Sequence, residues 1–87
     1  MGPVTRPLSL RKLTILLHLA DGKSYKQVAA TLGISDITVR VHVREIAGCL
    51  PKSALPPKDH VLLYCDRLLA AQPDVVAEIM QTMKLSA

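Results

Sequence analysis

Apolar residues recur every three or four positions along most of this 87-residue chain, which is the spacing of the buried face of a helix. One stretch, from Thr38 to Val43, alternates with the two-residue period of a strand. It lies inside a longer run whose apolar residues keep helical spacing as far as Leu50, so we interpret it as helix. The pattern predicts an all-α bundle of about five helices, with a C-terminal helical extension.

The first predicted helix lies between Leu8 and Ala20. Its apolar stripe consists of Leu10, Leu13, Leu17 and Ala20, with Leu16 beside it. Ser9 is placed to cap this helix and Asp21-Gly22 to end it. His18 lies among the leucines without a second metal donor one turn away, so we expect a partly buried helix residue and no metal site.

The stretch from Ser24 to Leu50 predicts two short helices joined by a tight turn. Ser24 and Gln27 have the spacing at which each side chain caps the other's backbone N–H, and Gly33 can adopt the left-handed conformation that ends a helix. Ser35 can cap the second helix. The buried face of that helix carries Val39, Val43, Ile46 and Leu50, and the opposite face carries Ile37, Arg40, Val41 and Arg44. This is the arrangement of a helix-turn-helix, whose second helix can enter DNA.

The run GKSYKQVAATLGISDITVRVHVREI also resembles the DNA-binding domain of the LuxR/GerE type, over about Leu8 to Leu50. The residues that stand on the family's pattern are Gly22, Lys23, Ser24, Val28, Ala29, Gly33, Ile34, Ser35, Thr38, Val39, Arg40 and His42. A weaker similarity links the run to region 4 of sigma factors, which usually lacks the histidine. The resemblance implies a helix-turn-helix that binds double-stranded DNA.

The second helix of this motif supplies the expected DNA contacts, because an α-helix fits the major groove and its side chains can reach the base edges. We expect base contacts from Arg40, Val41, Arg44 and Ile37, and the resemblance implies the same role for the first three. We expect contacts to the DNA backbone from Lys23, Ser24, Tyr25, Lys26, Thr38 and His42. For His42, packing or helix capping is an equal alternative.

The distribution of charge agrees with this expectation. The net charge of +4 is modest, but residues 1–52 hold eight Lys or Arg and three Asp or Glu, whereas residues 53–87 hold three and four. The basic charge therefore lies with the helix-turn-helix, as nucleic-acid binding requires.

The two cysteines, Cys49 and Cys65, are too few for a disulfide framework and lack the spacing of a zinc site. We interpret both as buried thiols of a cytoplasmic protein. The start of the chain, MGPVTRPLSL, lacks the apolar segment of a signal peptide, and charges interrupt every apolar stretch that could span a membrane.

The chain divides into four predicted parts: a flexible arm at 1–7, the DNA-binding core at 8–50, a proline-rich connector at 51–57 and a C-terminal helical pair at 58–87. One helix of the pair begins at Pro57 or Asp59 and runs to about Ala71; the other runs from about Asp74 to Lys84. The pair either completes the core or forms a dimer or partner surface. The residues assigned to that surface are Leu62, Cys65, Leu69, Val76, Ile79, Met80 and Met83.

Together these features predict a stand-alone, sequence-specific transcription regulator, more readily a repressor, that binds an inverted-repeat operator as a homodimer and needs no cofactor. The sensor or receiver domain that usually precedes this module is not expected. The alternative is a protein-binding adaptor or antagonist of another regulator or of RNA polymerase, acting through the C-terminal helices. No nucleophile, phosphate-binding loop or metal spacing supports an enzyme.

Overall fold

The computed structural model describes the backbone of residues 8–86 and the side chains of residues 8–83, so the predicted arm at 1–7 lies outside it. All regular secondary structure in this part of the chain is helical, which confirms the predicted all-α class. The elements are α1 (Leu10–Ala20), α2 (Tyr25–Leu32), α3 (Asp36–Gly48), α4 (Pro57–Leu63), α5 (Cys65–Ala70) and α6 (Pro73–Ser86). The count is six because the helix predicted from Pro57 to about Ala71 breaks at Tyr64, between α4 and α5.

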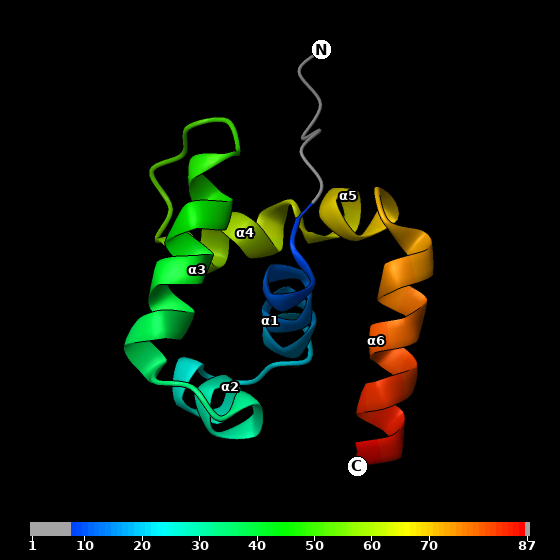
Figure 1. Ribbon diagram of the computed structural model, residues 1–87. Helices are drawn as coiled ribbons and strands as arrows, with labels where there is room; N and C mark the ends of the chain where they lie inside the picture. Colours follow the sequence, from blue (N-terminus) through cyan, green and yellow to red (C-terminus); the bar gives the residue numbers. More distant parts are fainter. Residues whose placement is uncertain (1–7, 87) are drawn as a thin grey trace.

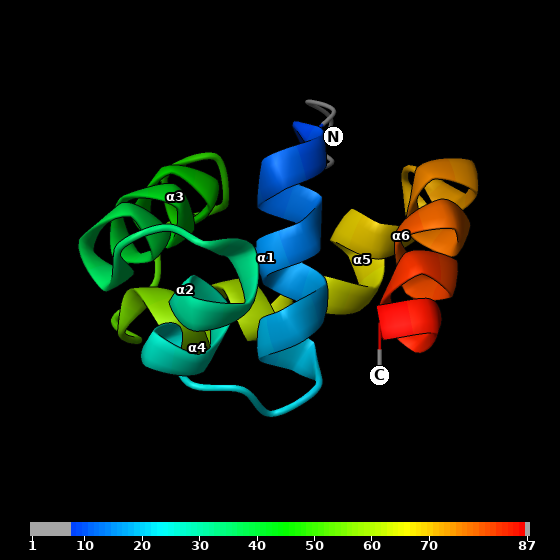
Figure 2. The same cartoon turned by 60° about the horizontal axis from the view of Figure 1, so that its bottom comes forward.

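Helix α1 lies in the middle of the molecule and contacts all five other helices (Figure 1). Turning the molecule shows α2, α3 and α4 on one side of α1 and α5 and α6 on the other (Figure 2). The side chains that α1 buries are Leu13, Ile15, Leu16, Leu17, His18 and Leu19. The predicted stripe was therefore wrong at its ends, where Leu10 and Ala20 are exposed. It was also too narrow, because neighbours on two sides bury almost the whole second half of the helix.

The predicted caps of the helix-turn-helix are present. Gln27 N–H donates to Ser24 Oγ at 3.1 Å while Ser24 N–H donates to Gln27 Oε1 at 2.8 Å, so the two residues cap each other. Gly33 ends α2 with a φ of 70°, in the region that favours glycine because it has no Cβ. Ser35 then caps α3 by accepting from Thr38 N–H at 3.1 Å. These short-range bonds fix the turn that orients α3.

Residues 49–56 lie outside the helices, and α4 begins at Pro57, whose missing N–H costs nothing in the first turn of a helix. Helix α4 packs on α3 and α1, whereas among the described helices α6 contacts only α1 and α5. The loop before α6 is tied to the start of α1, since Leu8 N–H donates to Gln72 Oε1 at 2.7 Å and Gln72 Nε2 donates to Leu8 O at 3.3 Å. The C-terminal helices therefore close the bundle around α1.

The two thiols differ in burial, so the expectation that both are buried was wrong for Cys49. Cys65 lies in the core, where burial, and after it the nearby Asp66 carboxylate, raises the pKa of its thiol. Cys49 is exposed because it follows α3 as its C-cap, one position away from the buried face that ends with Leu50.

We predict that Leu16→Ala lowers the free energy of unfolding by about 2–5 kcal/mol, because Leu16 is fully buried in the helix that every other helix contacts. The matched control is Leu63→Ala, whose side chain is 66 % exposed and should change stability by less than about 0.5 kcal/mol. Urea unfolding followed by circular dichroism measures both. Equal losses in the two variants would contradict a core built around α1.

Candidate nucleic-acid interface

Helix α3 has two unlike faces. Val39, Val43 and Ile46 are completely buried, which anchors the helix to the bundle. The four residues predicted to face bases, Ile37, Arg40, Val41 and Arg44, are all exposed, and Ile37 is 69 % accessible. The structure therefore places these side chains together on the outer surface of a rigidly held helix. That surface can offer hydrogen-bond donors and apolar contacts to a groove of DNA.

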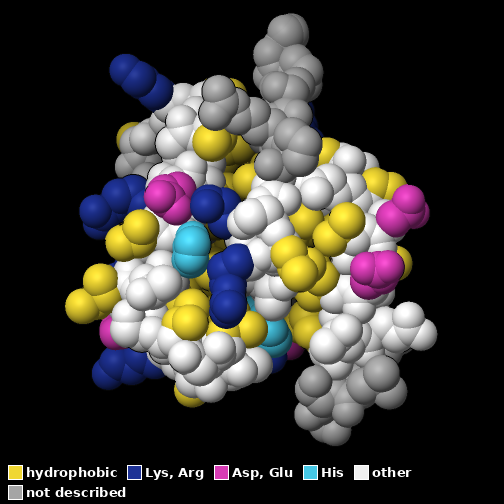
Figure 3. Space-filling model, viewed as in Figure 1, with side chains coloured by type: hydrophobic (Ala, Val, Ile, Leu, Met, Phe, Trp, Pro, Cys, Tyr) yellow, Lys and Arg dark blue, Asp and Glu magenta, His cyan; other side chains and the backbone are white. Residues whose placement is uncertain are grey.

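Basic side chains gather on the same part of the molecule. On the face shown in Figure 3, Lys and Arg lie over the half that holds α3 and α1. The edge formed by α6 instead shows acidic side chains on this face. The separation of charge found along the sequence is thus also a separation in space, and it would orient the α3 side toward a polyanion.

Tyr25, at the start of α2, brings two cations together. The Arg40 guanidinium lies 5.3 Å from the centre of its ring and the Lys58 ammonium lies 5.7 Å away. Burial raises the pKa of Tyr25, with Asp59 acting in the same direction and the charges of Arg40 and Arg44 opposing it. Lys58 was not among the predicted site residues, because it lies in α4, beyond the stretch that carries the family resemblance.

Thr38 and His42 are already engaged within the chain. The Thr38 hydroxyl lies 2.9 Å from that of Ser35 at the turn. His42 is partly buried, and its Nδ1 lies 3.4 Å from Glu45 Oε1, an ion-pair distance without hydrogen-bond geometry. Lys12 Nζ reaches the same carboxylate at 3.2 Å, and its hydrogen bond and charge hold the pKa of Glu45 below its usual value. His42 is thus directed toward Glu45 on its own helix.

The residues before and within the first turn of α2 differ in availability. Ser24 is exposed, and because Ser24 Oγ accepts the capping bond, its own proton can still be donated to a phosphate. Lys26 is exposed as well, on the outer side of the helix. Lys23 is partly buried, and its Nζ donates to His18 Nδ1 at 2.7 Å. The structure therefore directs Lys23 inward toward α1.

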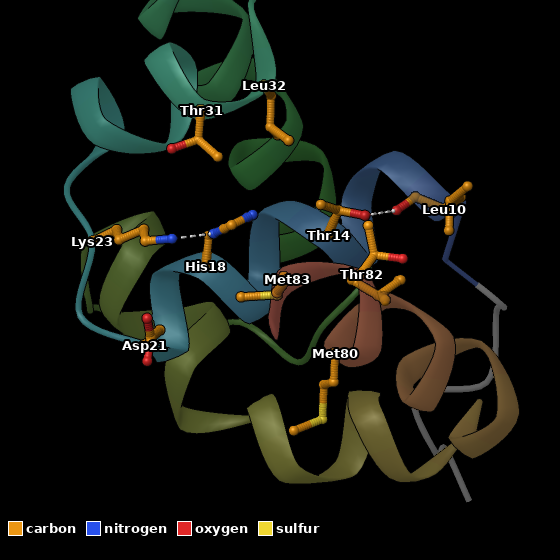
Figure 4. Close-up of a pocket in the computed structure, with 11 residues that line it drawn as sticks. Leu10, Thr14, His18, Asp21, Lys23, Thr31, Leu32, Met80, Thr82 and Met83 are labelled. Atoms are coloured by element: carbon orange, nitrogen blue, oxygen red, sulfur yellow. Dashed lines mark hydrogen bonds between the residues drawn. The ribbon is translucent and has the colours of Figure 1, made fainter. Parts of the chain in front are cut away.

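Lys23 and His18 stand at one end of a groove of about 700 Å³ between α1, α2 and α6 (Figure 4). Thr31 and Leu32 of α2 line one side, and Met80 and Met83 of α6 line the other. His18 is only 4 % exposed, and burial lowers its pKa; the nearby Lys23 charge lowers it further, against an opposite effect of Asp21. A neutral imidazole is the form that accepts a hydrogen bond from the Lys23 ammonium.

Most of the residues assigned to a dimer or partner surface are covered by the chain itself. Cys65, Val76 and Ile79 are buried, because α6 packs its apolar side on α1 and α5. The partly buried ones are Leu62, Leu69 and Met83. Met80 is 48 % exposed and lies on the groove. Of the described side chains in that set, Met80 is thus the one most open to another molecule.

Two comparisons with known proteins agree with this geometry. Residues 6–50 match the GerE family, described as bacterial regulatory proteins of the luxR family. The nitrate/nitrite response regulator protein NarP of Escherichia coli (strain K12) is 49 % identical over 39 residues, which are 45 % of this chain and 18 % of NarP. The chain therefore corresponds to less than a fifth of that relative's length. No solved structure matches the chain.

Within residues 8–86, no helix combines the length and apolar character that crossing a bilayer requires.

We predict that the chain loses folding stability as the pH falls below the ordinary histidine pKa of 6.5. Because the pKa of His18 is lower in the folded chain than in the unfolded chain, the unfolded state binds more protons between the two values. The stabilisation is complete above 6.5 and is lost as pH falls toward the folded pKa. Urea unfolding at a series of pH values measures the loss, and NMR titration of the imidazole reports the pKa.

Lys23→Gln is the matched variant, because it keeps a side-chain donor near His18 and removes the charge. Its His18 pKa should rise toward 6.5, and the pH dependence of stability should weaken. A wild-type His18 that titrates at or above 6.5 would contradict the prediction.

Proposed function

Because this chain belongs to the luxR family of bacterial regulatory proteins, we propose that it regulates transcription by binding specific sequences in double-stranded DNA. The observation that carries the proposal is α3, whose buried side is fixed in the core while its outer side presents Ile37, Val41 and Arg44 beside Arg40. A helix held in this way can enter the major groove without rearrangement. Preorganisation of this kind reduces the entropy lost on binding.

In this proposal the two types of contact come from different parts of the motif. Arginine donates to guanine O6 and N7, and the branched side chains of Ile37 and Val41 suit thymine methyl groups. Ser24, Tyr25 and Lys26, at the start of α2, lie where a scaffold helix meets the DNA backbone. Lys23 reaches a phosphate only by leaving His18, so its contribution should be small.

The proposed active form is a homodimer on an inverted repeat. One recognition helix makes few base contacts, and two copies on half-sites about one helical turn apart, roughly 34 Å, multiply the specificity. A bound dimer that covers a promoter excludes RNA polymerase, so we propose repression as the mode of action.

We predict that Arg44→Ala weakens binding to the preferred operator by about 1–3 kcal/mol and relaxes the preference at one base pair of each half-site. The measurement is selection from a random duplex pool, followed by titration of the selected operator with sedimentation analysis of the complex. An inverted-repeat motif bound by two chains is expected.

Arg67→Ala is the control, since Arg67 lies on α5 over Tyr64, in the C-terminal half that the proposal does not bring to DNA. It should leave both affinity and preference unchanged. Selection of no motif by the wild-type chain, with weak binding that ignores Arg44, would refute the proposed function.

A protein-binding adaptor is the second candidate, and the groove between α1, α2 and α6 is the observation that favours it. Leu10 is 64 % exposed at one end, and Met80 is 48 % exposed on the facing helix. Exposed apolar side chains along a groove are suited to a helix of a partner protein.

We predict on this basis that Met80→Asp abolishes regulation of a reporter gene in cells while the purified variant still binds DNA as the wild type does. The control is Gln81→Asp, which places the same charge on an exposed neighbouring position of α6 that does not line the groove. Unchanged regulation by Met80→Asp would remove the support for a partner at this groove.

A further inference from the structure

The cluster formed by Tyr25, Arg40 and Lys58 joins three helices that are separate in the sequence. Tyr25 lies in α2, Arg40 in α3 and Lys58 in α4. Both cations lie within the distance at which a tyrosine ring attracts positive charge. The Arg44 charge also acts on the Tyr25 phenol. Positive groups therefore converge on one side of the recognition helix.

The contact with Tyr25 distinguishes Arg40 from Arg44 on the exposed face of α3. Its guanidinium is held over the Tyr25 ring, toward α2 and α4, whereas Arg44 makes no cation–π contact among the described side chains. When a recognition helix lies in the major groove, base edges face its outer line and the phosphates of the two strands face its flanks. The position of Arg40 is that of a residue on the flank.

The charges of the cluster also favour an anion. Arg40 and Lys58 share one ring although they repel each other, and Asp59 is the acid whose charge acts on Tyr25 from the same helix as Lys58. A phosphate diester that accepts from both cations would offset their repulsion, and guanidinium forms paired hydrogen bonds with phosphate oxygens. The hydroxyl of the Tyr25 ring over which both cations lie is a further possible donor.

We infer that Arg40, Lys58 and the Tyr25 hydroxyl bind one phosphate of the DNA backbone, so that Arg40 sets the register of α3 while Ile37, Val41 and Arg44 read the bases. The inference rests on the proposed function. It differs from the role that the family resemblance implies for Arg40, and it adds α4 to the DNA-binding surface. Tyr25 acts in part as a positioning residue, because its ring holds both cations.

The test uses the full chain and the operator obtained by selection. Arg40→Ala and Lys58→Ala should each weaken binding by a similar factor on the operator and on a scrambled duplex, with unchanged base preferences in the selection. The slope of log K against log salt should become shallower by about 1 in each variant, since each loses a phosphate contact. Arg67→Ala, which removes a cation from the Tyr64 ring, should leave the slope unchanged.

A methylphosphonate scan of the operator locates the phosphate. Replacing the charged phosphate by a neutral methylphosphonate at one position per half-site should weaken the wild type, while Arg40→Ala and Lys58→Ala lose little further at that position. The variant that combines Arg40→Ala and Lys58→Ala should lose less affinity for the operator than the product of the two single losses, because both side chains bind the same phosphate.

Tyr25→Phe separates the hydroxyl from the ring. It should weaken binding modestly and retain the effect of Arg40→Ala, whereas Tyr25→Ala should lose most of that effect. Thermal unfolding shows whether Tyr25→Ala still folds. If Tyr25→Ala does not fold, the effect of Arg40→Ala is compared between Tyr25→Phe and the wild type alone.

Three results would overturn the inference. Arg40→Ala could relax one base position with an unchanged salt slope, which would make Arg40 a base-reading residue. The losses from Arg40→Ala and Lys58→Ala could multiply, or the scan could give two positions, which would assign them separate phosphates. In these cases the proposed function would still stand if the selected motif depends on Arg44. Failure to select any motif would refute both the proposed function and the inference about the phosphate.

Discussion

The burial of α1 is the constraint on which the rest of this structure depends. The helix contacts all five others, and six consecutive or nearly consecutive side chains from Leu13 to Leu19 are withdrawn from solvent. A helix of 11 residues is marginal in water by itself, so its stability comes from these neighbours. On one side of α1, its neighbours α2 and α4 hold α3 in place. On the other side, α5 and α6 cover α1. The recognition helix is therefore positioned through a helix that carries none of the predicted DNA contacts.

The local parts of the fold could be predicted because the signals that define them are local. The reciprocal cap of Ser24 and Gln27, the left-handed Gly33 and the buried face of α3 each depend on residues within a turn or two. The burial of α1 on nearly all sides could not be predicted in the same way. Periodicity shows one apolar stripe, whereas covering a helix from two directions depends on helices as distant in sequence as α5 and α6. The exposure of Cys49 has a local cause instead, since Cys49 is the C-cap of α3 beside its buried face.

The candidate site also has a part that follows from local sequence and a part that depends on long-range packing. The exposed face of α3 follows from its helical period, so Ile37, Arg40, Val41 and Arg44 could be placed on one surface from the sequence. Their partners could not. Lys58 meets Tyr25 only because α4 packs against α3, and Lys23 meets His18 only because the turn after α1 brings it back over that helix. Sequence reasoning thus identified which side chains face outward, while the fold decides which charges share a neighbour.

The pair of hydrogen bonds between Leu8 and Gln72 has a mechanical consequence. The glutamine amide satisfies both the N–H and the C=O of Leu8, as a neighbouring backbone would, so the segment just before α1 and the loop before α6 are joined. A force applied to α6 is then transmitted first to the beginning of α1 and not directly to α3. Because α1 contacts α3, a displacement of α6 would reach the recognition helix through the central helix.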